Sequence, residues 1–140
     1  MKTLARLAII MTLGLGVQSG VAQTDEELVR ATLTDYIEGT ANGEPERLHR
    51  AFHPDFNLYF VRNDTIQSWS GQGYIGNVKQ GRKSNRIGKI ISVDITNDAA
   101  TAKVEIDMPA RKRLYTDYFL LLKVKGQWKI VHKSFTYVTY

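Results

Sequence analysis

The stretch Tyr115–Phe135, YTDYFLLLKVKGQWKIVHKSF, decides the fold that this sequence predicts. Two runs alternate bulky and polar residues as strands do, one from Tyr115 to Lys125 and the other from Trp128 to Tyr137. Gly126 lies between them, and glycine between two strand-like runs is typical of a hairpin turn. We therefore expect the chain to end in a long β-hairpin.

The loop length of this hairpin determines which side chains share a face of the sheet. With a two-residue loop, Lys125-Gly126 or Gly126-Gln127, side-chain alternation places seven residues on one face. They are Asp117, Phe119, Leu121, Trp128, Ile130, His132 and Ser134. Cross-strand neighbours at this spacing lie within reach, so the pattern predicts a His132–Asp117 pair on an aromatic face. A three-residue loop would separate the set.

Further strands precede the hairpin in the sequence. Residues 89–96 and 99–108 form strand-like runs joined by an Asn97-Asp98 turn, and the second run alternates apolar with charged residues. Residues 56–61 and 65–70 form a shorter β-rich pair around Asn63-Asp64. Residues 71–80 favour a short helix that its glycines weaken.

Two helices open the domain. Thr24 and Glu27 have the spacing of a capping box. An apolar stripe at helical spacing follows, formed by Val29, Leu33, Tyr36 and Ile37. Pro45 suits the first turn of a second, short helix, which Pro54 ends near His53. Helices followed by antiparallel strands predict an α+β domain over residues 23–140.

A long antiparallel sheet curls because its strands twist, and around helices it forms a cone with a mouth. The segment 45–61, PERLHRAFHPDFNLYFV, and the final hairpin resemble the NTF2-like (SnoaL-like) superfamily, more narrowly the group named "putative lumazine-binding". The resemblance is most specific at His53-Pro54-Asp55 and at Trp128–Val131. It extends over residues 24–138. The resemblance implies an NTF2-like cone, a curved antiparallel sheet wrapped around N-terminal helices, with a pocket and often a dimer.

Residues 1–22 have the layout of a secretory signal peptide. Lys2 and Arg6 form a basic start, residues 7–17 form an apolar run, and Gly20 and Ala22 occupy the positions that a signal peptidase reads. The apolar run is shorter than the roughly 20 residues that a membrane-spanning helix needs. The sequence therefore predicts an exported protein, periplasmic or secreted after cleavage, without a membrane span.

Composition narrows the classes of partner and cofactor. The chain has 19 Lys and Arg against 14 Asp and Glu, a formal charge of +5, and no cysteine. The basic residues cluster within 79–89 and 111–113; such clusters attract anions or form solvated loops. Without a nucleic-acid motif, no nucleic-acid partner is predicted. His49 and His53 have metal-ligand spacing but no third ligand beside them, so neither metal nor cofactor is predicted.

Two groups of residues are candidates for function. His132 with Asp117 is the candidate catalytic pair, because a carboxylate orients a histidine that acts as general base. The resemblance adds Asp107 as an alternative base, because isomerases of that superfamily place an acidic residue inside the cone. Ordinary hydrogen bonds that close the sheet would explain the same residues. The candidate ligand-binding residues, which could equally serve packing, are Tyr59, Trp69, Tyr74, Phe119, Trp128, His132 and Ser134.

Three functions are compatible with the sequence. The first is binding of a small, aromatic or apolar molecule in the cone without established catalysis. The second is an isomerase or dehydratase that uses the His–Asp pair or Asp107 as base. The third is a dimeric interaction module with a filled cone. A homodimer through the sheet is predicted because both faces of the last two strands carry large apolar residues.

Overall fold

The computed structural model describes residues 22–140. The predicted signal peptide, residues 1–22, therefore lies almost wholly outside the described residues, and it stays a prediction. Helices α1 (Asp25–Asn42) and α2 (Pro45–Ala51) come first, and the short helix α3 (Gly71–Gly76) lies between two groups of strands. The strands are β1 (Phe52–Arg62), β2 (Thr65–Ser70), β3 (Ile87–Thr96), β4 (Ala99–Met108), β5 (Arg113–Val124) and β6 (Gln127–Thr139). A 3-10 turn, Pro109–Arg111, joins β4 to β5.

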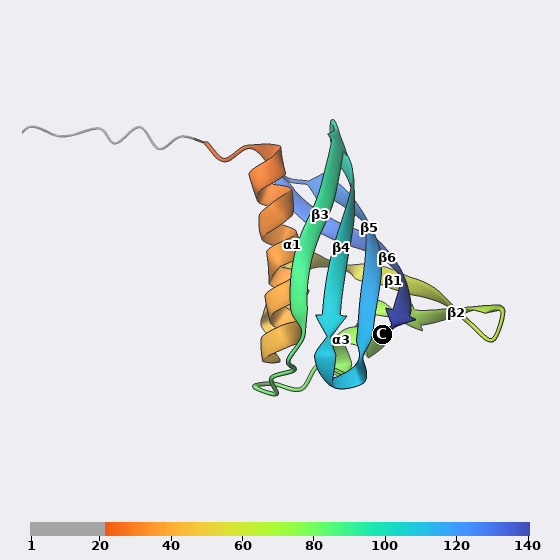
Figure 1. The fold of residues 1–140 in the computed structure, drawn as a ribbon. Helices are drawn as coiled ribbons and strands as arrows, with labels where there is room; N and C mark the ends of the chain where they lie inside the picture. Colours follow the sequence, from red (N-terminus) through yellow and green to blue (C-terminus); the bar gives the residue numbers. More distant parts are fainter. Residues whose placement is uncertain (1–21) are drawn as a thin grey trace, which may run out of the picture.

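The strands form one curved, open sheet in the order β2-β1-β6-β5-β4-β3, and α1 lies along it (Figure 1). This confirms the predicted α+β architecture. The predicted antiparallel sheet needs one correction, because β1 and β6 pair in parallel while every other neighbouring pair is antiparallel. The last strand, β6, returns to pair with β1. The helix α3, the 3-10 turn and four strands lie between them in the sequence, which gives room for a parallel crossover.

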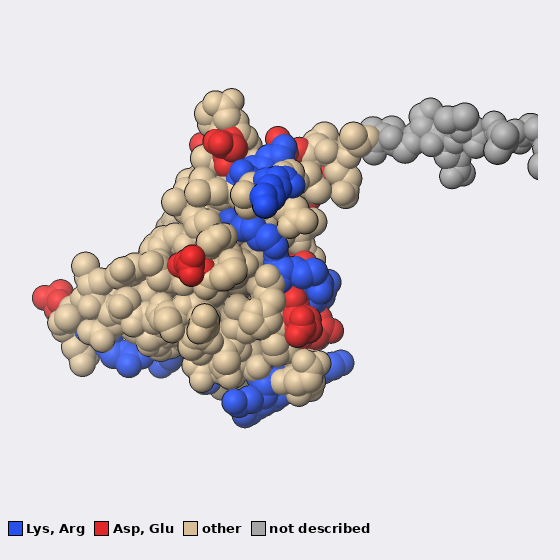
Figure 2. All heavy atoms as spheres, turned by 180° about the vertical axis from the view of Figure 1, so that it is seen from behind, with Lys and Arg blue, Asp and Glu red and all other residues tan. Residues whose placement is uncertain are grey.

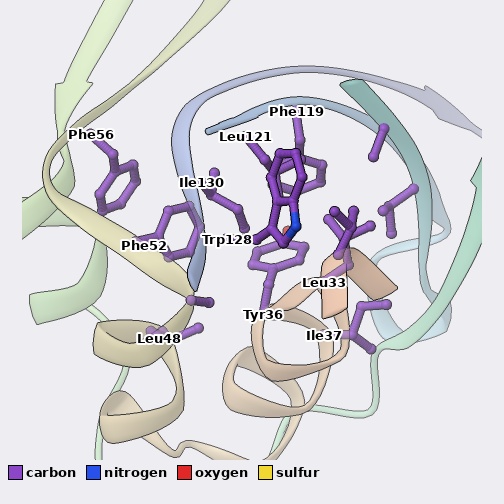
Figure 3. Close-up of a cluster of buried hydrophobic side chains, with 14 of the residues drawn as sticks. Leu33, Tyr36, Ile37, Leu48, Phe52, Phe56, Phe119, Leu121, Trp128 and Ile130 are labelled. Carbon is purple, nitrogen blue, oxygen red and sulfur yellow. The ribbon is translucent and has the colours of Figure 1, made fainter. Parts of the chain in front are cut away.

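The core fills the space between α1, α2 and the inner face of the sheet. Leu33, Tyr36 and Ile37 of α1 point toward Phe119 and neighbouring side chains of the sheet (Figure 3). Tyr36 is fully buried, and its ring meets that of Phe119 edge-on at 5.0 Å between centroids. The stripe predicted from helical spacing is thus the buried face of α1.

The start of α1 is hydrogen-bonded to the turn end of the final hairpin, where β5 meets β6. The predicted capping box is present, since Thr24 and Glu27 exchange both bonds. Asp25 accepts hydrogen bonds from Lys123 Nζ at 2.7 Å and from Trp128 Nε1 at 3.1 Å. These two donors hold the pKa of Asp25 below its ordinary value.

The Asp25 contacts predict a pH-dependent contribution to stability. A carboxyl whose pKa is lower in the folded than in the unfolded state stabilises the protein above its unfolded pKa, about 3.9, and this contribution disappears as pH falls through the folded pKa. Asp25→Asn should therefore lower the urea midpoint at pH 7 and have a smaller effect at pH 3. Asp64→Asn, an exposed turn residue, is the control. Equal losses for Asp25→Asn at both pH values would contradict this account.

Candidate functional site

A β-bulge in the final hairpin determines which side chains face the interior of the cone. The turn has two residues, Lys125 and Gly126, both with positive φ, and Val124 pairs with Gln127. Farther along, Leu121 pairs with Ile130 but Leu120 pairs with His132, so Val131 is an extra residue on β6. An extra residue of this kind inverts the alternation of side chains beyond it.

The bulge makes one sequence prediction wrong. His132 does not share the inner face with Asp117; it lies on the outer face, opposite the exposed Leu120. Its ring nitrogens lie 2.8 Å from Asn57 Oδ1 and 2.9 Å from Ser134 Oγ. Because the two residues of the candidate catalytic pair lie on opposite faces of the sheet, no His132–Asp117 general base can form.

The other predicted ligand-binding residues divide among three places. Trp69 and Tyr74 line the large cavity described below. Phe119 and Trp128 are buried in the core against α1, away from that cavity. Tyr59 and Ser134 lie on the outer face with His132, where the Tyr59 ring is 5.5 Å from the imidazole. The binding role of Trp69 and Tyr74 stays a prediction, and the structure brings only these two together at a cavity.

His132→Ala tests the outer-face assignment. The substitution removes the hydrogen bonds to Asn57 and Ser134, so the free energy of unfolding should fall by about 1 kcal/mol. The affinity of any ligand held in the cavity should stay within twofold of the unchanged protein. Urea unfolding and calorimetric titration measure the two quantities. A tenfold loss of affinity without loss of stability would place His132 at the binding site after all.

The cavity lies where α3, the 77–86 loop and the ends of β1, β2, β5 and β6 converge. This is the lower end of the cone in the view of Figure 1. The volume of the cavity is about 990 Å³. A cone filled by its own side chains, one of the alternatives drawn from the sequence, does not fit this observation. Six aromatic rings line the cavity, those of Phe60, Trp69, Tyr74, Tyr115, Phe135 and Tyr137.

A buried ion pair forms part of the inner wall. Lys133, which the bulge turns inward, lines the cavity and places its Nζ 3.1 Å from Asp117 Oδ2. The Tyr36 hydroxyl donates to the same oxygen at 2.5 Å. Burial, together with the neighbouring Asp117 carboxylate, raises the pKa of Tyr36 well above its ordinary value, so Tyr36 remains a donor. The ammonium also lies 4.9 Å from the centre of the Phe135 ring, within the range of a cation–π contact.

Positive charge dominates the rest of the cavity. Two cations, Lys133 and Arg86, are largely shielded from solvent, and six more lie around the mouth. These six mouth cations are Arg62, Lys79, Arg82, Lys83, Arg111 and Arg113. Figure 2 shows Lys and Arg side chains gathered along the lower end of the molecule, where Figure 1 places the 109–111 turn and the 77–86 loop. No aspartate, glutamate or histidine is among the described residues that line the cavity.

Sequence reasoning missed the inward-facing members of this site. Strict alternation along β6 puts Lys133 and Phe135 on the face opposite Trp128 and Ile130, and nothing in residues 128–135 signals a bulge, since the segment contains neither glycine nor proline. The two basic clusters were recognised as able to attract anions. Their convergence on one cavity depends on the fold, because the 77–86 loop and the 109–113 turn are distant in the sequence.

Two further observations concern metal ligands and helix hydropathy in the described part of the chain. Within residues 22–140, no three His, Asp or Glu side chains gather closely enough to hold a metal ion. His49 and His53 instead border a second hollow of about 470 Å³ beside Phe52 and Ile75. The same residues include no helix with the length and hydropathy required to cross a bilayer.

The curved open sheet packed on an N-terminal helix, with a cavity at one end, defines an NTF2-like protein. Solved NTF2-like proteins of unknown function from Shewanella baltica and Methylobacillus flagellatus superpose with a TM-score of 0.72 each at 26% identity. The first match covers 83% of this chain and 95% of the other, and the second covers 90% and 100%. Residues 24–136 match the family described as "Putative lumazine-binding", and the chain belongs to that family.

A curated relative carries an enzyme name. The protein named "Aldolase FrzH" from Cladobotryum sp. is 27% identical over 116 residues, which cover 82% of this chain and 93% of that protein. The match spans most of the described domain and nearly the whole of that protein.

Proposed function

We propose that this protein binds a small, planar aromatic molecule in the cavity at the lower end of the cone. The observation that carries the proposal is a cavity of about 990 Å³ lined by six aromatic rings. Binding sites for small molecules are concave, mostly preformed and rich in aromatic side chains. The family description supports the same class, because lumazine is a flat, two-ring heteroaromatic compound.

The aromatic lining is ordered by contacts among its own members. Phe60 stacks on Phe135 with 4.9 Å between ring centroids, and Trp69 meets Phe60 edge-on at 4.9 Å. Trp69 keeps 41% of its surface exposed although it lines the cavity. An aromatic ligand can cover this surface and gain about 0.5–1.5 kcal/mol from each aromatic pair beyond the buried area.

Titration with lumazine tests the proposal. A ligand at 100 times its dissociation constant should stabilise the folded protein by about 2.7 kcal/mol, which a thermal shift detects. Trp69→Ala should weaken binding at least tenfold, while Tyr118→Ala, which removes a similarly exposed ring from the outer face, should leave it unchanged. No stabilisation by lumazine or by a panel of two-ring aromatic compounds would contradict the proposal.

An enzyme of aldolase type is the second candidate function. The aldolase-named relative and the Lys133 ammonium at the cavity wall favour it, because an ammonium can stabilise the enolate that aldol chemistry requires. Against it, the cavity lining provides no carboxylate or imidazole as base, and Asp117 lies behind Lys133. Deuterium exchange at the methylene of phenylpyruvate, followed by NMR, should exceed the buffer rate if this function holds. Exchange at the buffer rate would exclude this chemistry for that substrate.

We further propose a homodimer through the outer face of the sheet. Tyr118, Leu120, Leu122 and Val124 alternate along β5, and each is at least 40% exposed. A contiguous apolar patch of this kind is unusual on a monomer. Light scattering should show a dimer at tens of micromolar, and Leu120→Glu should convert it to a monomer. Ile66→Glu, an equally apolar change on the projecting β1–β2 hairpin, should leave the dimer intact; a wild-type monomer would contradict the prediction.

A further inference from the structure

We infer that the cavity selects aromatic ligands that carry an oxyanion group, a carboxylate or a phosphate. The inference rests on the proposed function, and it specifies the class of ligand. Eight cationic side chains line the cavity and no acidic one does. The whole sequence has 14 acidic residues beside its 19 basic ones, so a cavity lining without any acidic residue does not follow from composition alone.

The mouth cations are not neutralised by the protein itself. Within residues 22–140, the ion pairs of this chain involve Arg30, Arg47, Arg50, Lys123 and Lys133, and thus none of the six mouth cations. A cleft lined by charges of one sign focuses the field and raises the local concentration of ligands of opposite charge. The mouth therefore attracts anions and repels cations.

Arg86 provides a specific anchor inside the cavity. Arg86 lines the cavity, and its Nε is shielded from solvent without a hydrogen-bond acceptor in the described part of the chain. An unsatisfied buried donor of this kind costs about 1–3 kcal/mol, and more when it is charged. Arginine binds carboxylate and phosphate oxygens through paired N–H groups, so an oxyanion held against Arg86 would give this guanidinium an acceptor.

Lys133 differs from Arg86 because it forms a direct ion pair with Asp117, whereas Arg86 interacts with that carboxylate without an ion-pair contact. Its side chain is 5% exposed, and its ammonium is held between Asp117 Oδ2 and three aromatic rings. It can still donate a hydrogen bond to a ligand oxygen, since an ammonium has three donors. The net positive charge that selects an anion therefore comes from Arg86 and the mouth cations, with Lys133 as an additional donor.

Three probes with the same ring system separate charge from shape: 2-naphthoate, 2-naphthyl phosphate and the neutral 2-naphthamide. Calorimetric titration of the full chain at low salt should show at least one anion binding tenfold or more tightly than the amide. The advantage should shrink as salt rises, because screening weakens the field of the mouth. The tighter anion of the two identifies the preferred oxyanion.

Two variants test whether the preference for anions over the amide arises from residues of the cavity. Arg86→Gln should reduce the advantage of the anion over the amide to less than threefold. Arg82→Gln with Lys83→Gln, two exposed positions that should not affect folding, should reduce it partly and lower its salt dependence. Lys89→Gln, an exposed cation on β3 outside the cavity, should change nothing.

The outcomes distinguish this inference from the proposed function. If the amide binds as tightly as both anions and Trp69→Ala abolishes its binding, the selection for anions is wrong and the aromatic site stands. If none of the three probes nor lumazine binds, the proposed function fails and the inference fails with it. If the anions bind better but the cavity variants change nothing, the anion site lies elsewhere and the inference is overturned.

Discussion

Asp117→Asn should lower the free energy of unfolding by about 3–5 kcal/mol, which is the usual cost of leaving one partner of a buried ion pair alone. Asp117 is 1% exposed, and the Lys133 side chain is 5% exposed. Without the carboxylate, the Lys133 side chain would lose its ion-pair partner while it stays almost fully buried. Urea unfolding followed by circular dichroism measures the change.

A double-mutant cycle separates the ion pair from the packing of each residue. Lys133→Met alone should also be strongly destabilising, because it leaves the Asp117 carboxylate with Tyr36 as its hydrogen-bonding partner. Asp117→Asn combined with Lys133→Met removes both charges and should recover most of the loss, as replacing a buried pair by neutral groups often does. The Arg30–Glu26 pair on the surface of α1 is the comparison, and its removal should cost less than about 0.5 kcal/mol. Losses below 1 kcal/mol for both buried single changes would contradict the account.

The local features of the fold could be predicted from the sequence. The capping box of Thr24 and Glu27 and the apolar stripe of α1 depend on residues close in sequence, and the structure confirms both. Among the hairpin loops that the sequence left open, the structure has the two-residue loop Lys125-Gly126. The predicted face of His132 was wrong, because β6 has a bulge at Val131 that inverts the alternation of the residues beyond it. No residue type near Val131 indicates this bulge.

The candidate site was less predictable because it depends on long-range contacts. The expected helix over 71–80 ends at Gly76, and the basic segment that follows becomes a loop at the cavity mouth. The position of this loop is set by the end of α1: Gly81 N donates to Gly43 O at 2.7 Å, and Ser84 N donates to Ala41 O at 2.7 Å. No pattern within residues 77–86 reveals these partners.

The contact at Gly43 makes that dependence testable. Gly43 has φ +67°, and an added Cβ would lie 2.5 Å from Lys79 O and 2.5 Å from Arg82 N. Gly43→Ala should therefore cost about 1–2 kcal/mol for the left-handed backbone, and about 1–3 kcal/mol more for the collision with the loop backbone. The total loss, measured by urea unfolding, should be about 2–5 kcal/mol.

Gly126→Ala is the matched control for this substitution, because Gly126 has φ +77° but no atom within 4 Å of an added Cβ. It should show only the backbone cost, about 1–2 kcal/mol. Gly43→Ala should in addition displace Lys79 and Arg82 from the mouth, and so weaken the preference of the cavity for 2-naphthoate over 2-naphthamide, which Gly126→Ala should preserve. Equal losses of stability and an unchanged preference in both variants would show that the Gly43 contact does not position the loop. A greater loss confined to Gly43→Ala would show that the end of α1 sets both the stability of this region and the charge at the cavity mouth.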